Sequence, residues 1–93
     1  MQTYVMLGKY SSEAVRDISA NRTENSLNLI RELGGKMISM YSLLGGYDLI
    51  LTAEFKDIQT AMKASLGLTV LTGIGFSTYP AISIADFDRL IAR

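Results

Sequence analysis

The segment SLLGGYDLILT, residues 42–52, holds a single carboxylate, Asp48, which follows two glycines and a tyrosine. A carboxylate on a half-covered surface can have a raised pKa and act as a general base. Asp is also a common turn residue whose side chain accepts hydrogen bonds from nearby backbone amides. A hairpin cap, or an ion pair with Lys9, is therefore the simpler interpretation of Asp48, and the general base is the alternative.

Other side chains could bind a ligand or a second chain. Tyr4 and Tyr41 each offer an aromatic wall and a hydroxyl, and tyrosine is enriched at protein interfaces. Met6 offers adaptable apolar packing. We predict five ligand-binding or interface residues, and we assign no catalytic and no metal-binding residue: Tyr4, Met6, Tyr41, Asp48 and Ile50.

The residue types that are missing exclude several kinds of chemistry. The 93 residues include no His, no Cys and no Trp. Nucleophile–histidine triads, thiolate chemistry, zinc knuckles and most transition-metal sites are therefore excluded, and no cofactor is expected. Nine basic and nine acidic residues cancel and are spread along the chain. A phosphate backbone has no basic patch to bind, so nucleic acid is not an expected partner.

Apolar residues are unusually abundant for a chain of this length. They make up 48% of the sequence, whereas charged residues make up 19%. One small core cannot hide so many apolar side chains, which predicts self-association as a homodimer or a larger oligomer. Residues 64–85 carry no charge, but the Ser, Thr, Gly and Pro among them favour a buried helix end and a buried strand over a membrane span. The first residues do not resemble a signal peptide, so a cytoplasmic location is expected.

Periodicity and capping residues predict eight elements in one domain, residues 1–93. Strands are expected at 3–10, 36–44, 47–55 and 74–82, and helices at 12–19, 21–33, 57–68 and 83–93. Asn21 with Glu24 forms a capping-box pattern, and Asp57 and Ser83 are further helix caps. Val15 and Ile18 are expected to face inward, as are Ile58, Ala61, Met62 and Leu66 of the third helix.

The two middle strands are predicted to form a hairpin through Gly45 and Gly46, because glycine tolerates the backbone angles of tight turns. If Leu44 pairs with Tyr47, the register pairs Leu43 with Asp48, Tyr41 with Ile50, Ser39 with Thr52 and Met37 with Glu54. The face that helices cover then carries Ile38, Met40, Leu44, Leu49, Leu51, Ala53 and Phe55. The opposite, open face is mixed in polarity, and Asp48 lies on it near Lys9 or Tyr10.

The order β-α-β-β-α-β, with a C-terminal helix, has one economical solution under the rule of right-handed crossovers. This solution is a ferredoxin-like α+β sandwich whose antiparallel sheet has the strand order 4-1-3-2. Helices cover one side of the sheet, and the mixed face remains open. Two such faces packed together would bury the apolar surplus.

Several segments, in this order, resemble the GYD domain family. They are TYVMLGKY at 3–10, LGGK at 33–36, GGYDLIL at 45–51 and FDRLIAR at 87–93, and the Gly46-Tyr47-Asp48 tripeptide is the family's signature. The resemblance extends over essentially the whole chain. It implies a dimeric α+β barrel of ferredoxin-like halves and no particular reaction.

Three functional hypotheses follow. The first is a binding or regulatory module that holds a small uncharged or aromatic ligand, or a partner, against the open face. The second is a cofactor-independent isomerase or oxygenase with Asp48 as base and a Tyr as hydrogen-bond donor, which requires a cavity of at least about 300 Å³ with Asp48 in its wall. The third is a purely structural dimerisation unit.

Overall fold

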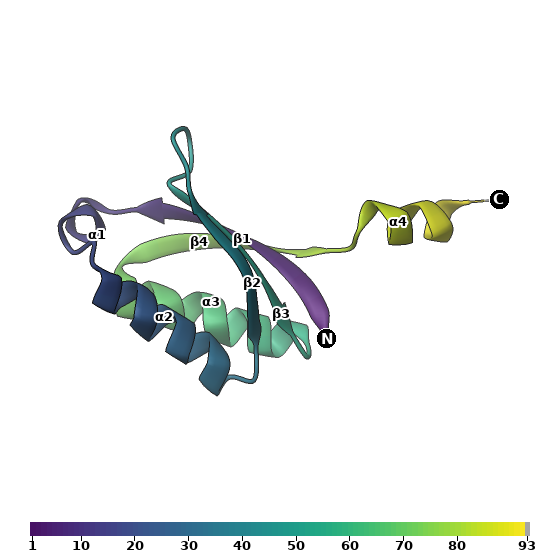
Figure 1. The fold of residues 1–93 in the computed structure, drawn as a ribbon, viewed down its shortest axis with the longest axis horizontal. Helices are drawn as coiled ribbons and strands as arrows, with labels where there is room; N and C mark the ends of the chain where they lie inside the picture. Colours follow the sequence, from purple (N-terminus) through teal and green to yellow (C-terminus); the bar gives the residue numbers. More distant parts are fainter. Residues whose placement is uncertain (93) are drawn as a thin grey trace.

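The computed structural model describes residues 1–92 of the chain. It has four strands and four helices in these residues (Figure 1). The strands are β1 (Gln2–Tyr10), β2 (Lys36–Ser42), β3 (Leu49–Phe55) and β4 (Ile74–Ala81). The helices are α1 (Ser12–Arg16), α2 (Ala20–Glu32), α3 (Ile58–Thr72) and α4 (Ile84–Ile91).

The strands form one antiparallel sheet with the order β2-β3-β1-β4, which is the predicted order counted from the other edge. In Figure 1, α2 and α3 lie together on one side of this sheet, and α4 projects away from the body beyond the end of β4. The predicted ferredoxin-like layering is thus confirmed. Its physical basis is that each crossover returns an apolar helix face to the same side of the sheet.

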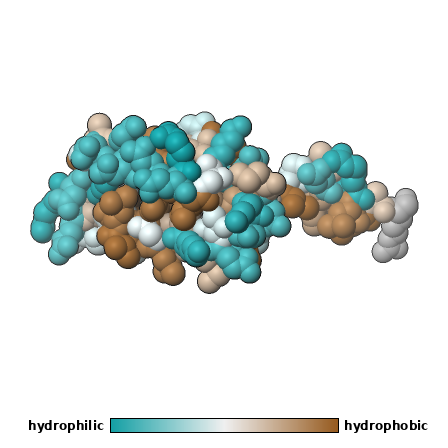
Figure 2. Space-filling model, turned by 90° about the horizontal axis from the view of Figure 1, so that it is seen from below, coloured by the Kyte–Doolittle hydropathy of each residue, from teal (hydrophilic) through white to brown (hydrophobic). Residues whose placement is uncertain are grey.

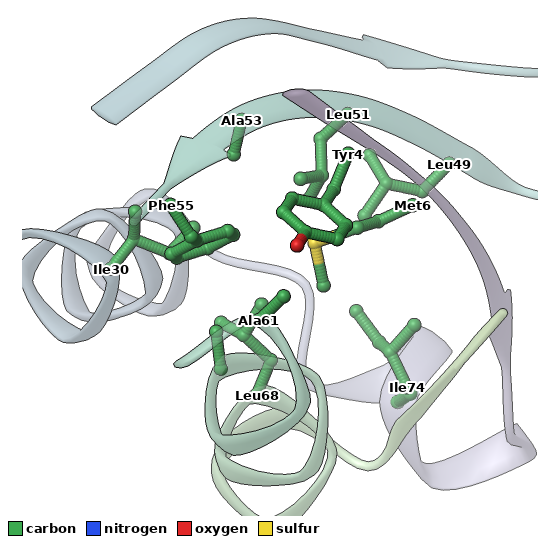
Figure 3. Packing of buried hydrophobic residues seen from close by; sticks show 12 residues of the cluster. Tyr4, Met6, Ile30, Leu49, Leu51, Ala53, Phe55, Ala61, Leu68 and Ile74 are labelled. Carbon is green, nitrogen blue, oxygen red and sulfur yellow. The ribbon is translucent and has the colours of Figure 1, made fainter. Parts of the chain in front are cut away.

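The core lies between the sheet and these two helices (Figure 3). Its largest fully buried side chains are Tyr4, Met6, Ile30, Leu51, Phe55 and Leu68. The Tyr4 and Phe55 rings lie 5.9 Å apart between centroids at a tilted angle, a favourable arrangement for two aromatic rings. The Tyr4 hydroxyl donates a hydrogen bond to the Gln2 side chain at 2.7 Å, so its polar end is satisfied at the edge of the core.

The connection from β1 to α2 differs from the prediction. Helix α1 ends at Arg16, and the side chains of Val15 and Ile18 are exposed rather than inward-facing. The small residue Ala14 is buried in their place. The cap of α2 is Ser19, whose hydroxyl accepts a hydrogen bond from the Arg22 amide, and not Asn21 as the capping-box pattern predicted. Two hydroxyl or amide residues close together each offer a cap, and the pattern alone does not choose between them.

Helix α3 begins after its predicted cap, Asp57, but it extends to Thr72, four residues beyond the predicted end at 68. The Asp57 carboxylate accepts hydrogen bonds from the Thr60 hydroxyl at 2.6 Å and from the Thr60 amide at 2.9 Å. These two bonds, the side-chain bond first, hold the pKa of Asp57 below its usual value. At the other end, Gly73 adopts the left-handed conformation with φ 75°, which a residue with a Cβ reaches only with strain.

The prediction of the inner face of α3 is wrong in part. Ala61 is buried as predicted, together with Ala64 and Leu68, whereas three residues predicted to face inward are exposed: Ile58, Met62 and Leu66. This helix is apolar around most of its circumference, so its periodicity does not define one face. The small alanines let the helix approach the sheet and α2 closely, and the longer side chains are left on the outside.

The hairpin has the predicted register near its turn and a different one at its base. Tyr41 pairs with Ile50 and Ser39 with Thr52, as predicted. A β-bulge between Met37 and Ser39 then shifts the pairing, so that Met37 lies opposite Ala53 and packs against the core instead of facing Glu54 on the open side.

Two residues assigned to the covered face of the hairpin lie elsewhere. Ile38 sits at the bulge and is half exposed, and Leu44 lies in the connection 43–48 with its side chain fully exposed. Strand β2 ends at Ser42 and β3 begins at Leu49, so the connection is longer than predicted.

No helix in the described residues 1–92 combines the length and the apolar character needed to cross a membrane.

Candidate functional site

The face of the sheet away from the helices is formed by alternate residues of all four strands. In β1 these are Thr3, Val5, Leu7 and Lys9, because Tyr4, Met6 and Gly8 point into the core. The pairings of β1 with β3 and β4 place Val5 between Thr52 and Tyr79, and Leu7 between Ile50 and Ser77.

The middle of this open face is apolar and its rim is polar. Val5, Leu7 and Ile50 are half-buried side chains at its centre. Tyr41 on β2 and Tyr79 on β4 flank them and are 65% and 51% exposed. Most of the remaining positions are polar: Thr3, Lys9, Lys36, Ser39, Thr52, Glu54 and Ser77. Thr52 lies beside Val5 on the inner strand β3, and the others lie toward the ends and edges of the face. An apolar centre with a polar rim is the usual composition of a protein interface.

The structure separates the five predicted interface residues. Tyr41 and Ile50 lie on the open face, as the hairpin register predicted. Tyr4 and Met6 do not, because they are 1% and 0% exposed within the core, and the strand's alternation puts Val5 and Leu7 on the open side instead. The sequence missed Val5, Leu7 and Tyr79. A signal was available for Tyr79, because alternation along the strand places it on the same face as Ser77 and Ala81.

Asp48 ties the hairpin to the central strand. Its carboxylate oxygen Oδ2 accepts a hydrogen bond from the Tyr10 amide at 2.8 Å, and its own amide donates to the Gly8 carbonyl at 2.9 Å. The Asp48 carbonyl also accepts a hydrogen bond from the Leu43 amide at 2.9 Å, which closes the hairpin. One residue therefore extends the β1–β3 pairing beyond Leu49, where the regular strand begins.

Lys9 adds a second link between the same two segments. Its ammonium group donates a hydrogen bond to the Gly46 carbonyl at 2.9 Å, rather than forming an ion pair with Asp48. Gly46, Tyr47 and Asp48 are thus held against the end of β1 by one side-chain acceptor and one side-chain donor. This geometry matches the turn role expected for Asp48 and gives the general-base hypothesis no support.

A cavity of about 240 Å³ lies under the sheet near the start of α2. It is lined by core side chains such as Leu49, Leu51 and Ile74, and by polar groups of α2 and its cap, among them Arg22 and Ser19. The Arg22 guanidinium sits 5.5 Å above the Tyr10 ring, a cation–π distance. Asp48 is not among the side chains that line this cavity.

Acid–base and metal chemistry have few candidates around the open face. Among residues 1–92, no three His, Cys, Asp or Glu side chains gather closely enough to hold a metal ion. The carboxylates of Asp48 and Glu54 stand at opposite ends of β3, too far apart for a paired mechanism. What the face offers is apolar contact area, two tyrosines and a polar rim.

Comparison with known proteins assigns the family. The GYD domain profile matches residues 4–91, which span all four strands and all four helices but for the first two residues of β1. The chain belongs to the GYD domain family. The Gly46-Tyr47-Asp48 signature of this GYD domain is the segment that Lys9 and the Tyr10 amide hold against β1.

Two named proteins are similar to this GYD domain. A glutamine synthetase and cystathionine beta-lyase binding protein of Thermus thermophilus is 29% identical over 96 residues, which cover 100% of this chain and 98% of that protein. The crystal structure of the leucine response regulatory protein LrpA of Mycobacterium tuberculosis matches with a TM-score of 0.59 at 5% sequence identity. That match covers 88% of this chain but only 51% of the regulator, so the GYD domain spans about half its length. At this identity the likeness concerns the fold alone.

Proposed function

We propose that this GYD domain is a non-catalytic binding module that pairs with a second copy through its open sheet face and acts by binding other proteins. The observation that carries the proposal is the apolar centre of that face, formed by Val5, Leu7 and Ile50 between two tyrosines. Face-to-face packing of two sheets buries such a centre and leaves the polar rim in water.

Two further observations support a binding role. The Asp48 carboxylate is engaged with a backbone amide, and it does not line the cavity beneath the sheet. The relative from Thermus thermophilus, similar over the full length of this chain, is named for binding glutamine synthetase and cystathionine beta-lyase. We propose the same class of partner for this chain, namely an enzyme of amino-acid metabolism.

The self-association is tested by substituting Leu7→Lys. In a two-fold symmetric dimer each substitution occurs twice, and two unpaired ammonium groups would enter the apolar centre. We expect the dissociation constant of the dimer to rise by at least about 100-fold, which corresponds to about 2.8 kcal/mol. Light scattering across a dilution series measures this, with Thr23→Lys on the exposed side of α2 as the control. A wild-type protein that remains a single chain at high concentration, or an unchanged Leu7→Lys variant, contradicts the proposed dimer.

The partner is tested separately with the purified glutamine synthetase and cystathionine beta-lyase of the organism from which this chain comes. We expect the wild-type domain to bind at least one of these enzymes in a calorimetric or surface-based assay. Leu7→Lys then reports whether the enzyme contacts the dimer or the single chain. Binding to neither enzyme would contradict the proposed class of partner and leave the dimer intact.

A further inference from the structure

Helix α4 is not packed against the rest of its own chain. It points away from the body in Figure 1, and its apolar side chains are between 49% and 75% exposed. The radius of gyration is 14.0 Å, whereas a compact domain of this length has about 12.3 Å. Figure 2 shows the projecting end of the chain separated from the body, with hydrophobic surface on one side.

The sequence of α4 is that of an amphipathic helix, with one apolar side that can pack against another surface. Its apolar residues lie within about a third of the helix circumference at 100° per residue, and they are Ile84, Phe87, Leu90 and Ile91. On the opposite side, Arg89 forms an ion pair with Asp86, and Ser83 caps the first turn by accepting a hydrogen bond from the Asp86 amide. A helix of eight residues is marginal in water by itself, so its stability calls for a packing partner.

A second unpartnered apolar surface lies on the outer side of α3. Ile58, Met62, Leu66 and Val70 follow one another at four-residue intervals and are between 51% and 88% exposed. Such residues form one continuous ridge along a helix. We call these four residues the α3 ridge. It lies on the side of α3 away from the core residues Ala61, Ala64 and Leu68.

The first three residues of the α3 ridge border a groove of about 280 Å³ between α3 and β4. Ile58, Met62 and Leu66 line one side, and Thr78 and Pro80 of β4 line the other. The Thr78 hydroxyl donates a hydrogen bond to the Ser65 hydroxyl at 3.0 Å across the floor. The Thr78 donor is thus already satisfied within the protein, which lowers the cost of covering this part of the groove with an apolar occupant.

The groove and α4 match in length and in charge. Eight residues separate Ile58 from Leu66, a rise of about 12 Å, and the eight residues of α4 have the same length. The one charged side chain within α3 is Lys63, which follows Met62, whereas α4 carries Asp88 beside its apolar residues. We propose that the groove between α3 and β4 binds α4 of a second copy of this chain.

The connection between β4 and α4 favours a second copy over the same one. Only Ile82 and Ser83 join the two elements, and α4 leaves the body at the end of β4 (Figure 1). Ser83 is in the extended conformation that its capping role requires, with φ −64° and ψ 155°. Ile82 alone would then have to reverse the chain for α4 to return to its own groove.

This contact is distinct from the open sheet face, because the α3 ridge and the groove lie on the helix side of the molecule. It does not depend on the proposed sheet-to-sheet dimer, and both contacts can form at once. Eight residues are fewer than the roughly 20–30 residues per partner of a stable interface. The exchange of α4 must therefore be reciprocal, so that two helices and two grooves contribute, and its combination with the sheet face builds assemblies larger than a dimer.

Engineered cysteines test the contact directly, because the natural chain has none. Leu90→Cys is mixed with Ile58→Cys or with Leu66→Cys, each pair is refolded together, and the mixture is oxidised mildly. The direction of α4 in the groove decides which of the two ridge positions it meets, so we expect one pair to give a disulfide-linked dimer in high yield. Arg89→Cys, on the opposite side of α4, is the matched control and should cross-link at least about tenfold less.

The alternatives give different results. If α4 returns to its own groove, the double variant that carries both cysteines of the productive pair forms its disulfide within one chain and runs as a monomer, which overturns the proposal. Equal yields from Leu90→Cys and Arg89→Cys indicate random collision and also overturn it. The absence of a disulfide between Leu90→Cys and either ridge position also overturns the proposal. In light scattering, Phe87→Ser should lower the mass to that of the sheet-face dimer, or to a single chain where that dimer fails to form. Leu7→Lys should leave the disulfide yield unchanged, so the two interfaces can fail independently.

Discussion

The most direct test of the hairpin geometry is Asp48→Ala. The substitution removes the acceptor that lies 2.8 Å from the Tyr10 amide and leaves the backbone of the turn in place. The Tyr10 amide lies at the end of β1, beside the hairpin. The turn residues 43–47 have no carboxylate that could accept its hydrogen bond in place of Asp48. The change thus isolates the structural contribution of the signature aspartate.

The size of the effect follows from the environment of this bond. A hydrogen bond to a charged group contributes about 1.5–3 kcal/mol, and a buried donor left without a partner costs about 1–3 kcal/mol. Tyr10 is half-buried, which places the expected loss in the free energy of unfolding near 2 kcal/mol. For a domain of this length that corresponds to a decrease in Tm of about 8–16 °C.

The assay is urea unfolding followed by circular dichroism at two fixed protein concentrations, since self-association raises apparent stability. Asp48→Asn retains a side-chain oxygen and should cost about half as much, because a neutral acceptor forms a weaker bond. Lys9→Ala removes the exposed bond to Gly46 and should change stability by less than about 0.5 kcal/mol. If Asp48→Ala unfolds within about 0.5 kcal/mol of the wild type, the structural role assigned to this residue is refuted.

Two further predictions concern packing and pH. Gly35→Ala should destabilise the protein by about 1–3 kcal/mol, because a Cβ there would lie 2.5 Å from a ring carbon of the buried Phe55. In the same urea assay Gly67→Ala should change stability by less than about 1 kcal/mol, since its Cβ meets the flexible end of Leu29 at 3.1 Å and alanine favours the helix; equal effects of the two variants would contradict this account of the core. The lowered pKa of Asp57 makes its contribution to stability complete above its unfolded pKa of about 3.9 and lost as the pH falls through its folded pKa. In thermal melts, the difference in Tm between the wild type and Asp57→Asn should therefore be constant above about pH 5 and become smaller below about pH 4. A difference in Tm that stays constant down to about pH 2 would show that the carboxylate is not the group responsible.

The sheet topology could be predicted because several independent constraints agree. Alternating segments, capping residues such as Asp57 and Ser83, and right-handed crossovers leave a single strand order. The hairpin register near the turn was also predicted, since Tyr41 opposite Ile50 follows from the spacing around the two glycines. The bulge after Met37 was not, because one extra residue in a strand leaves the apolar pattern of Met37, Ile38 and Met40 ambiguous.

The faces of the elements were harder to predict than their order. The apolar run of β1 has no polar alternation, so the sequence does not say whether Tyr4 or Val5 points toward the helices. Helix α3 has the same difficulty, and its small residues, which permit close approach, define the inner side better than its large ones. The apolar surplus itself predicted a second buried surface, and the structure contains three exposed apolar surfaces in its described part: the open sheet face, the α3 ridge and the apolar side of α4.

The two edge strands, β2 and β4, show how a protein with several exposed apolar surfaces avoids open-ended aggregation. A sheet margin with free backbone groups recruits strands from neighbouring molecules and leads toward fibrils. In β2 the irregularity at Ile38 breaks the row of hydrogen-bonding groups, and in β4 Pro80 lacks an amide hydrogen near the end of the strand. Endless lateral addition is thereby disfavoured at both margins, and copies of the chain are left to meet through side chains, whose shape and number limit the size that an assembly can reach.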